Sequence, residues 1–167
     1  MEKAKKLLKE NLPYLILFLI LVLVKFYVVS PIRVNGESMS KTLEDRDIMI
    51  LDEISYRFGE IKRFDIVVVK KNGEYLIKRV IGLPGEVIRY EDNTLYINNK
   101  KIEEKFYHEE TKDFETKVPK GKYYVMGDNR TNSVDSRMIG PFSKKEIIGK
   151  TNFIVYPFHR FGTVQKK

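Results

Sequence analysis

A long apolar run near the N-terminus constrains this 167-residue chain more than any other feature. It reads LPYLILFLILVLV from Leu12 to Val24 and, after Lys25, continues as FYVV to Val29. About eighteen residues are enough for a helix to cross the hydrocarbon core of a bilayer. The run therefore predicts a transmembrane anchor over residues 12–29.

A cleaved secretory signal peptide has a similar opening, with a positive start followed by an apolar core. Its core is shorter, however, and ends at a cleavage site made of small residues. Here the run ends in FYVVSPIRV, which favours an uncleaved anchor. Lysines dominate the preceding segment, and such a bias keeps that end in the cytoplasm. We therefore predict a cytoplasmic tail over residues 1–11 and an extracytoplasmic domain over residues 30–167.

The rest of the chain has the pattern of short strands, because runs rich in β-branched residues are bounded by Gly, Asp and Asn. The expected strands cover residues 47–53, 65–70, 74–82, 86–91 and 94–97, with two more in KYYVMGD and TNFIVYPF. The capping-box spacing of SKKE predicts a short helix starting at Ser143. Residues 98–122 are expected to form an exposed excursion of the sheet. The predicted fold class is mainly β, with one N-terminal transmembrane helix.

The composition excludes several kinds of chemistry. The chain has no cysteine, which rules out disulfides, thiolate metal sites and a cysteine nucleophile. Two histidines, His108 and His159, are too few for a multi-histidine metal site and disfavour a Ser-His-Asp triad. We expect no cofactor and no metal. The net charge of +8 suits headgroups, nucleic acid or a solvated exterior, but nucleic-acid binding is disfavoured because the basic residues are scattered among acids.

A serine nucleophile would then need a base other than histidine, and a neutral lysine can serve. A lysine buried without a counter-ion has a lowered pKa and can accept a serine proton. Lys78 lies in an apolar strand, on the predicted face of Leu76 and Val80. Taken alone, Lys78 is better interpreted as a solvent-facing lysine, as most strand lysines are. Ser38 taken alone reads as a turn serine that bonds its own backbone.

Several motifs in one order change this interpretation. GESMSKTL begins at Gly36, RFDIVVV at Arg63, YLIKRVIGLPGE at Tyr75 and GDNRTNSVDSR at Gly127, all after the apolar run. Together they resemble the type I signal peptidases, membrane-bound Ser/Lys proteases that remove signal peptides from exported proteins. The short form with one anchor looks most like the Gram-positive branch. The resemblance implies a signal-peptidase/LexA-like, β-rich catalytic domain in the cell membrane.

The resemblance also implies roles for individual residues. Ser38 would be the nucleophile, with its backbone N–H in the oxyanion hole, and Lys78 would be the general base. The Ser133 hydroxyl would orient the lysine amine. Asp135 and Arg137 would form a structural salt bridge behind the site.

The implied substrates are the signal peptides of secretory preproteins, cleaved after an Ala-x-Ala-type site. Further implied partners are the phospholipid bilayer and the secretion translocon. Shallow apolar pockets would admit small side chains at substrate positions −1 and −3, and Gly36 would permit an unusual backbone at the turn. The expected substrate-binding residues are Ile32, Val34, Gly36, Met39, Leu43, Leu76 and Ile77.

One position departs from the family pattern. Lys41 stands where the family usually has proline in Ser-Met-x-Pro-Thr-Leu. Proline would fix φ and stiffen the turn, whereas lysine leaves it looser and adds charge.

Two other functions remain open at this point. One is a self-cleaving Ser/Lys protease of the repressor type, disfavoured by the anchor and by the lack of a DNA-binding module. The other is a membrane-tethered binding module that has kept the motifs without the activity.

Overall fold

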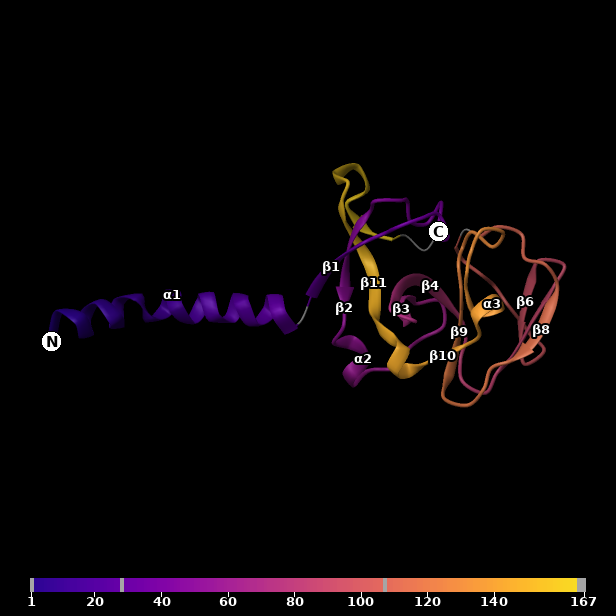
Figure 1. Ribbon diagram of the computed structural model, residues 1–167, viewed down its shortest axis with the longest axis horizontal. Helices are drawn as coiled ribbons and strands as arrows, with labels where there is room; N and C mark the ends of the chain where they lie inside the picture. The colour runs from indigo at the N-terminus through magenta and orange to yellow at the C-terminus, as the bar shows by residue number, and fades with distance from the viewer. Residues whose placement is uncertain (1, 28, 107, 165–167) are drawn as a thin grey trace.

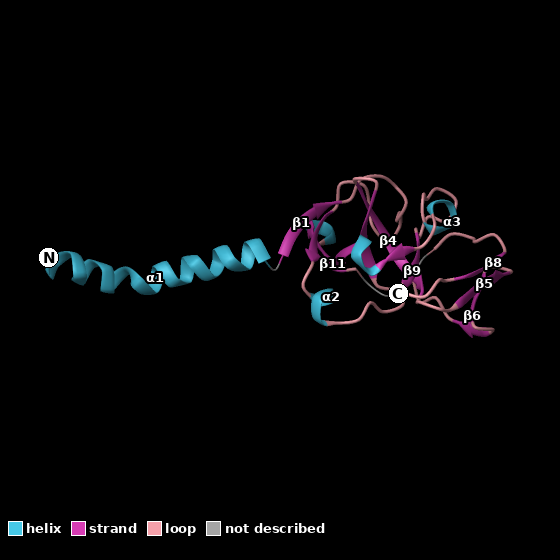
Figure 2. Ribbon diagram, turned by 60° about the horizontal axis from the view of Figure 1, so that its bottom comes forward, coloured by secondary structure: helices cyan, strands magenta, loops and turns pink. Residues whose placement is uncertain are grey.

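The computed structural model describes residues 2–27, 29–106 and 108–164, which form a long helix attached to a β-rich body (Figures 1 and 2). The helix α1 (Glu2–Tyr27) projects from the end of the body that carries β1. Large hydrophobic side chains on its middle turns are exposed, from 46% at Leu12 to 71% at Tyr14. Taken over the described residues, no helix combines the length and apolar character that a membrane crossing needs.

The larger sheet has eight strands in the order β1-β2-β11-β3-β4-β9-β10, with β12 paired to β11. All of its pairs are antiparallel. Its central strand β3 has four consecutive buried residues, which matches the unbroken IVVV run in the sequence. The strands are β1 (Val29–Arg33), β2 (Ile48–Asp52), β3 (Ile66–Lys71), β4 (Glu74–Gly82), β9 (Lys122–Met126), β10 (Phe142–Ser143), β11 (Ile147–Tyr156) and β12 (Gly162–Thr163).

The smaller sheet has four antiparallel strands in the order β7-β6-β5-β8 and lies at the end of the body far from α1 (Figure 1). Its strands are β5 (Val87–Glu91), β6 (Thr94–Ile97), β7 (Lys100–Ile102) and β8 (Phe114–Lys117). Asp92, Asn93, Asn98 and Asn99 have positive φ at its two tight turns, as the Asn-rich turn signals predict. The segment 98–122 supplies two of these strands and the buried side chains of Glu104, Thr111 and Val118.

The sheets share a core, and a second core lies beneath the GESMSKTL segment. Where the sheets meet, Ile81 and Met126 of the larger sheet pack with Ile88 and Tyr90 of the smaller one. The predicted fold class, a mainly β domain with an N-terminal helix, is confirmed.

The remaining helices are short. They are α2 (Ser55–Phe58), α3 (Ser136–Ile139) and the 3-10 turns Lys144–Glu146 and Phe158–Arg160. The helix predicted to start at Ser143 is confirmed as the first of these turns, with the capping box formed as expected. The strands expected over 74–82 and 94–97 have those same bounds, whereas β11 begins at Ile147, four residues before the expected TNFIVYPF strand starts at Thr151.

Candidate active site

The segment 36–43 forms an irregular turn, here called the serine turn, anchored by two apolar side chains. Met39 and Leu43 are 1% and 0% exposed and pack in the core beneath it. Gly36 has a φ of +89°, a region that L side chains rarely adopt, and its N–H donates to Asp45 Oδ1 at 2.9 Å. The apolar anchors thus fix the depth of Ser38 in the domain.

A second segment, residues 127–130, clamps the serine turn through polar contacts. The Asn129 N–H donates to the Ser38 carbonyl at 3.1 Å, and Asn129 Nδ2 donates to the Glu37 carbonyl at 3.1 Å and to Ser40 Oγ at 3.2 Å. A side chain at Gly127 would overlap the Ser38 carbonyl oxygen, so only glycine lets the two backbones approach this closely.

Asp128 ties the same two segments to the strand that carries Lys78. Its carboxylate accepts a hydrogen bond from Thr42 Oγ1 at 2.6 Å and a bidentate pair from Arg79 at 2.9 and 2.6 Å. Asp128 is fully buried and Arg79 is 4% exposed, so removing either partner would leave an uncompensated charge in the interior. The contact couples the serine turn to β4.

Lys78 and Ser38, forty positions apart in sequence, meet in the structure. Lys78 Nζ donates to Ser38 Oγ at 2.6 Å and to the Ile77 carbonyl at 3.1 Å. Its side chain is 3% exposed, which contradicts the alternative of a solvent-facing lysine. Burial lowers the pKa of Lys78 to about 8, against the negative charges of Asp135 and Asp128, which raise it. Because these acids make no direct contact with the amine, the desolvation cost dominates.

Asp135 and Arg137 form the expected ion pair, with Arg137 Nη2 at 2.7 Å and Nε at 2.9 Å from the carboxylate. Burial alone would raise the pKa of Asp135, but hydrogen bonds from the Arg137 side chain and the Gly127 N–H outweigh it, so that pKa is lowered. The pair holds the 127–137 segment together, since Gly127 donates to Asp135 at 3.0 Å.

Ser133 belongs to the same segment, but its hydroxyl makes no hydrogen bond to Lys78 Nζ in the structure. Its Oγ is buried and lies near enough to the Asp135 carboxylate to help lower the pKa of that group. It contacts Gly127, whose other neighbour is the Ser38 carbonyl.

Two cavities open beside the Ser38–Lys78 pair, and both are lined in part by Asn35, Ser38, Leu76 and Lys78. The first, here called the apolar cavity, has a volume of about 400 Å³. Its apolar lining is formed by Ile32, Val34, Met39, Leu51, Val68, Leu76, Ile77 and Ile148. The second, the polar cavity, has a volume of about 570 Å³. It is otherwise lined by Gly36, Glu37, Asp45, Asn132 and Val134.

The seven predicted substrate-binding residues divide between these places. Five of them line the apolar cavity, and Gly36 lines the polar one. Leu43 lines neither of the two, because it is fully buried in the core under the serine turn.

Sequence reasoning missed the residues that position the serine turn: Arg79, Asp128 and Asn129. Asp128 and Asn129 lie inside the GDNRTNSVDSR motif, and Arg79 follows Lys78 in YLIKRVIGLPGE. Their place in these motifs could have indicated that they belong to the site. Their partners could not be read from the chain, since the contacts span 49 to 92 positions.

Lys41 has a φ of +69°, which proline cannot adopt. The usual family proline therefore does not fit the serine turn as this chain forms it. No group of three or more His, Asp or Glu side chains is placed to hold a metal in the described part of the chain.

A serine hydroxyl bonded to a buried lysine amine, on a mainly β domain, is the arrangement of a serine endopeptidase with a Ser/Lys dyad. The chain matches the family model for signal peptidase, peptidase S26, over residues 7–156. It is 37% identical to signal peptidase I T of Bacillus subtilis, with 95% of this chain and 90% of that one covered. It is 36% identical to signal peptidase IB of Staphylococcus aureus, with 94% and 93% covered.

Among solved structures, the chain is similar to a crystal structure of a signal peptidase I from Enterococcus faecalis V583. That match has a TM-score of 0.50 and 37% identity, and covers 55% of this chain and 96% of the other. The chain belongs to the S26 signal peptidases and is a signal peptidase I, a serine endopeptidase of a membrane-associated family.

Proposed function

We propose that Ser38 and Lys78 cleave the signal peptides of secretory preproteins, with Ser38 as nucleophile and Lys78 as general base. The observation that carries the proposal is the 2.6 Å contact between Ser38 Oγ and a lysine amine that is 3% exposed. An ammonium donates across this contact, whereas a neutral amine accepts the serine proton along the same line. Burial favours the neutral form.

The reaction then proceeds in two halves. Ser38 Oγ bonds to the scissile carbonyl carbon as its proton moves to Lys78 Nζ, and the carbonyl electrons move onto the oxygen. The backbone N–H of Ser38 stabilises this oxyanion. Collapse breaks the C–N bond, and the leaving amine takes the proton from Lys78. Water, deprotonated by Lys78, then hydrolyses the acyl ester and frees Ser38.

The apolar cavity is proposed to hold the small side chains at positions −1 and −3 of an Ala-x-Ala-type site. Its walls come from β1 and from β4, so an extended substrate could lie between these two segments as an added strand. Ile32 and Val34 would border it on one side, and Leu76 and Ile77 on the other. The limited volume favours small side chains.

Supporting roles are proposed for three residues. Ser133 would orient the neutral amine: its hydroxyl is buried and lies beside Gly127, which also borders the Ser38 carbonyl. Asp135 and Arg137 would hold the 127–137 segment in place through their ion pair.

We also propose the membrane arrangement predicted from the sequence: tail 1–11 in the cytoplasm, anchor 12–29, and the domain from residue 30 outside. It is supported by the apolar run and by the exposed apolar side chains on α1, a surface that needs a nonaqueous partner. The bilayer would then be a partner, with the translocon close by. When protease is added to intact protoplasts, it should digest the domain. If the domain is digested only after lysis, it faces the cytoplasm and the proposed orientation is wrong.

The direct test is the purified protein with an Ala-x-Ala preprotein. Ser38→Ala should abolish processing while the domain stays folded by circular dichroism. Residual turnover above about a thousandth of wild type would remove Ser38 from the nucleophile role. Ser40→Ala, two residues away and outside the pair, is the matched control: it removes one acceptor of the Asn129 clamp, so it should lower turnover severalfold at most and not abolish it.

A further inference from the structure

The turn Phe158–Arg160 lies beyond residues 7–156, which match the family model, yet it contacts the serine turn. It joins β11 to β12, which pair antiparallel as a hairpin at the yellow end of the chain (Figure 1). The Phe153 and Phe161 rings meet edge to face at 5.1 Å within this hairpin, and Val164 packs against the core beneath the serine turn. The hairpin is therefore fixed in the domain beside the serine turn.

Arg160 extends from this turn to three oxygen atoms of residues 42–47. Its Nη2 donates to the Thr42 carbonyl at 3.1 Å and lies 3.0 Å from Asp47 Oδ2, and its Nη1 lies 3.6 Å from Glu44 Oε1. The Asp47 side chain is 1% exposed and that of Arg160 is 24% exposed. Solvent screens a charge pair with a buried partner only weakly, so this contact holds the guanidinium against the 42–47 segment.

Thr42, within the serine turn, is held through its carbonyl, its hydroxyl and its N–H. The carbonyl accepts from Arg160, the hydroxyl donates to Asp128 Oδ2 at 2.6 Å, and the N–H donates to the Met39 carbonyl at 3.1 Å. Met39 is the neighbour of Ser38 in the chain. A shift of Thr42 would therefore reach the nucleophile through one hydrogen bond and one peptide unit.

Asp47 supports the other end of the serine turn. Its Oδ2 accepts the Glu44 N–H at 2.9 Å, and its own N–H donates to the Glu44 carbonyl at 3.1 Å, which closes the loop 44–47. Asp45 in this loop accepts the Gly36 N–H at 2.9 Å. Arg160 thus stabilises the last residues of the serine turn directly and its first residue through the loop.

We propose that Arg160 is a positioning residue: by holding both ends of the serine turn, it keeps Ser38 Oγ at its reactive distance from Lys78 Nζ. This rests on the proposed function, because it assigns a support to the proposed nucleophile. Arg160 acts from the C-terminal hairpin, whereas Asn129 acts from the 127–130 segment. Catalytic groups must be held to within about 0.5 Å, and a misplacement of about 1 Å costs on the order of a hundredfold in rate.

The test replaces Arg160 in the full-length chain and measures processing of an Ala-x-Ala preprotein. Arg160→Ala should lower kcat about tenfold, because the serine turn loses a support while the reacting groups are unchanged. KM should stay within about twofold, since neither Arg160 nor residues 42–47 line the apolar cavity proposed to hold the substrate. Arg160→Lys keeps the charge but lacks the planar fork, so its kcat should fall only about threefold.

Rescue by a free cation is a readout that a loss of general stability would not change. Arg160→Ala opens a space beside the Asp47 carboxylate, so guanidinium chloride, far below its unfolding concentration, should raise the kcat of this variant severalfold. Sodium chloride at the same ionic strength should not. Arg160→Met fills the same space with an uncharged side chain, so guanidinium should leave its kcat unchanged.

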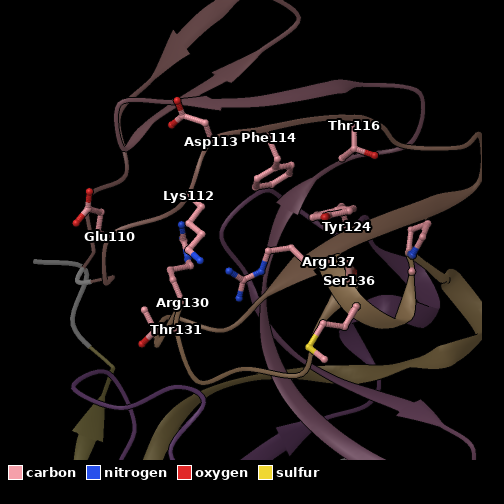
Figure 3. Close-up of a pocket in the computed structure, with 13 residues that line it drawn as sticks. Glu110, Lys112, Asp113, Phe114, Thr116, Tyr124, Arg130, Thr131, Ser136 and Arg137 are labelled. Atoms are coloured by element: carbon pink, nitrogen blue, oxygen red, sulfur yellow. The ribbon is translucent and has the colours of Figure 1, made fainter.

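Lys112→Ala is the matched control for the lost positive charge. Lys112 lines a cleft of about 800 Å³ between α3 and β8 (Figure 3), and that cleft shares no lining residue with the two cavities beside Ser38. The variant should keep the wild-type kcat and KM and should not respond to guanidinium.

A wild-type kcat in Arg160→Ala would overturn the positioning role. So would a loss of kcat that equals the loss of folded protein measured by circular dichroism at the assay temperature, or a loss that guanidinium does not reverse. If Arg160→Ala does not fold at that temperature, Arg160→Lys decides: a kcat about threefold lower with unchanged KM supports the role, and a wild-type kcat overturns it. Wild type that fails to process the preprotein would instead overturn the proposed function.

Discussion

The serine turn and the strand β4 place their key side chains by different physical means. The serine turn is irregular, contains two positive φ angles at Gly36 and Lys41, and is held by hydrogen bonds from a distant segment. β4 is an extended strand paired on both sides, with β3 along its length and with β9 at its second half, where the register shifts between Val80 and Gly82. The position of the Ser38 side chain therefore depends on polar contacts, whereas the lowered pKa of Lys78 depends on burial in a sheet.

Because of this difference, we expect substitutions around Ser38 and substitutions of Lys78 to have different effects on activity and stability. Polar clamps can be removed one at a time, and each loss should displace the nucleophile without unfolding the domain. A buried amine carries an energetic cost that the fold tolerates, so replacing it should abolish activity and yet stabilise the protein.

The largest expected effect is at Lys78. Lys78→Met keeps the length and apolar stem but removes the base, so processing should fall by a thousandfold or more. Between the unfolded pKa of 10.5 and the folded value of about 8, the folded state binds fewer protons, so stability rises with pH in that window. Below about pH 8 the full penalty is present, and Lys78→Met should raise the free energy of unfolding at pH 7 by about 3 kcal/mol.

Chemical denaturation at pH 7 and pH 10 measures this gain, which should shrink at the higher pH. Lys78→Arg is the paired variant: it should be as inactive as Lys78→Met but not stabilised, since guanidinium stays charged. An active arginine variant would remove Lys78 from the mechanism.

The second expected effect is the pH dependence of the wild-type enzyme. The proposed role of Lys78 as general base requires its neutral form, so kcat/KM should rise with pH through an ionisation near the pKa of about 8. At pH 6 the neutral fraction is about a hundredth, so the rate should be about a hundredfold below its alkaline plateau. A limb near pH 6.5 would instead implicate a histidine.

A smaller effect is expected when the clamp on the serine turn is weakened. Asn129→Ala removes the donors to the Glu37 carbonyl and Ser40 Oγ, while the backbone bond to Ser38 remains. We expect kcat to fall about tenfold, KM to stay within about twofold, and stability to fall by about 1–2 kcal/mol. Asn152→Ala, exposed on β11, is the control and should alter none of the three. An unchanged kcat in Asn129→Ala would show that the clamp is dispensable.

The smallest effect on activity is expected at Lys41. Lys41→Pro restores the family pattern but cannot adopt a φ of +69°, so it should lower the free energy of unfolding by about 2 kcal/mol and kcat severalfold. Lys41→Gly tolerates that φ and should keep most of the activity. A proline variant that is more stable than wild type would mean that the serine turn takes another backbone conformation in solution.

Much of the fold was predictable from local pattern. Strands such as β4 and β6 were predicted with their correct bounds, because runs of β-branched residues end at turn-forming Gly, Asp and Asn. The capping box at Ser143 was also predictable from local pattern, because its contacts lie within four residues. β11 was predicted too short, because its first half follows the capping turn and contains Gly149, which weakens a strand signal.

The sequence by itself determined the class of this protein. Its ordered motifs, the absence of cysteine and the scarcity of histidine singled out Ser38 and Lys78, and the family comparison agrees with that class. These conclusions depend on residue identity and order, which need no coordinates. The site roles remain proposals that the variants above test.

Tertiary structure alone decided how the site is built. A pattern cannot say that Lys78 is 3% exposed, because burial depends on strands and turns that fold over it from elsewhere in the chain. Nor can it pair Asp128 with Arg79 and Thr42, or bring Asn129 to the Ser38 carbonyl. Hydrogen bonds and desolvation act over a few ångströms in space, and closeness in space is what a linear sequence does not record.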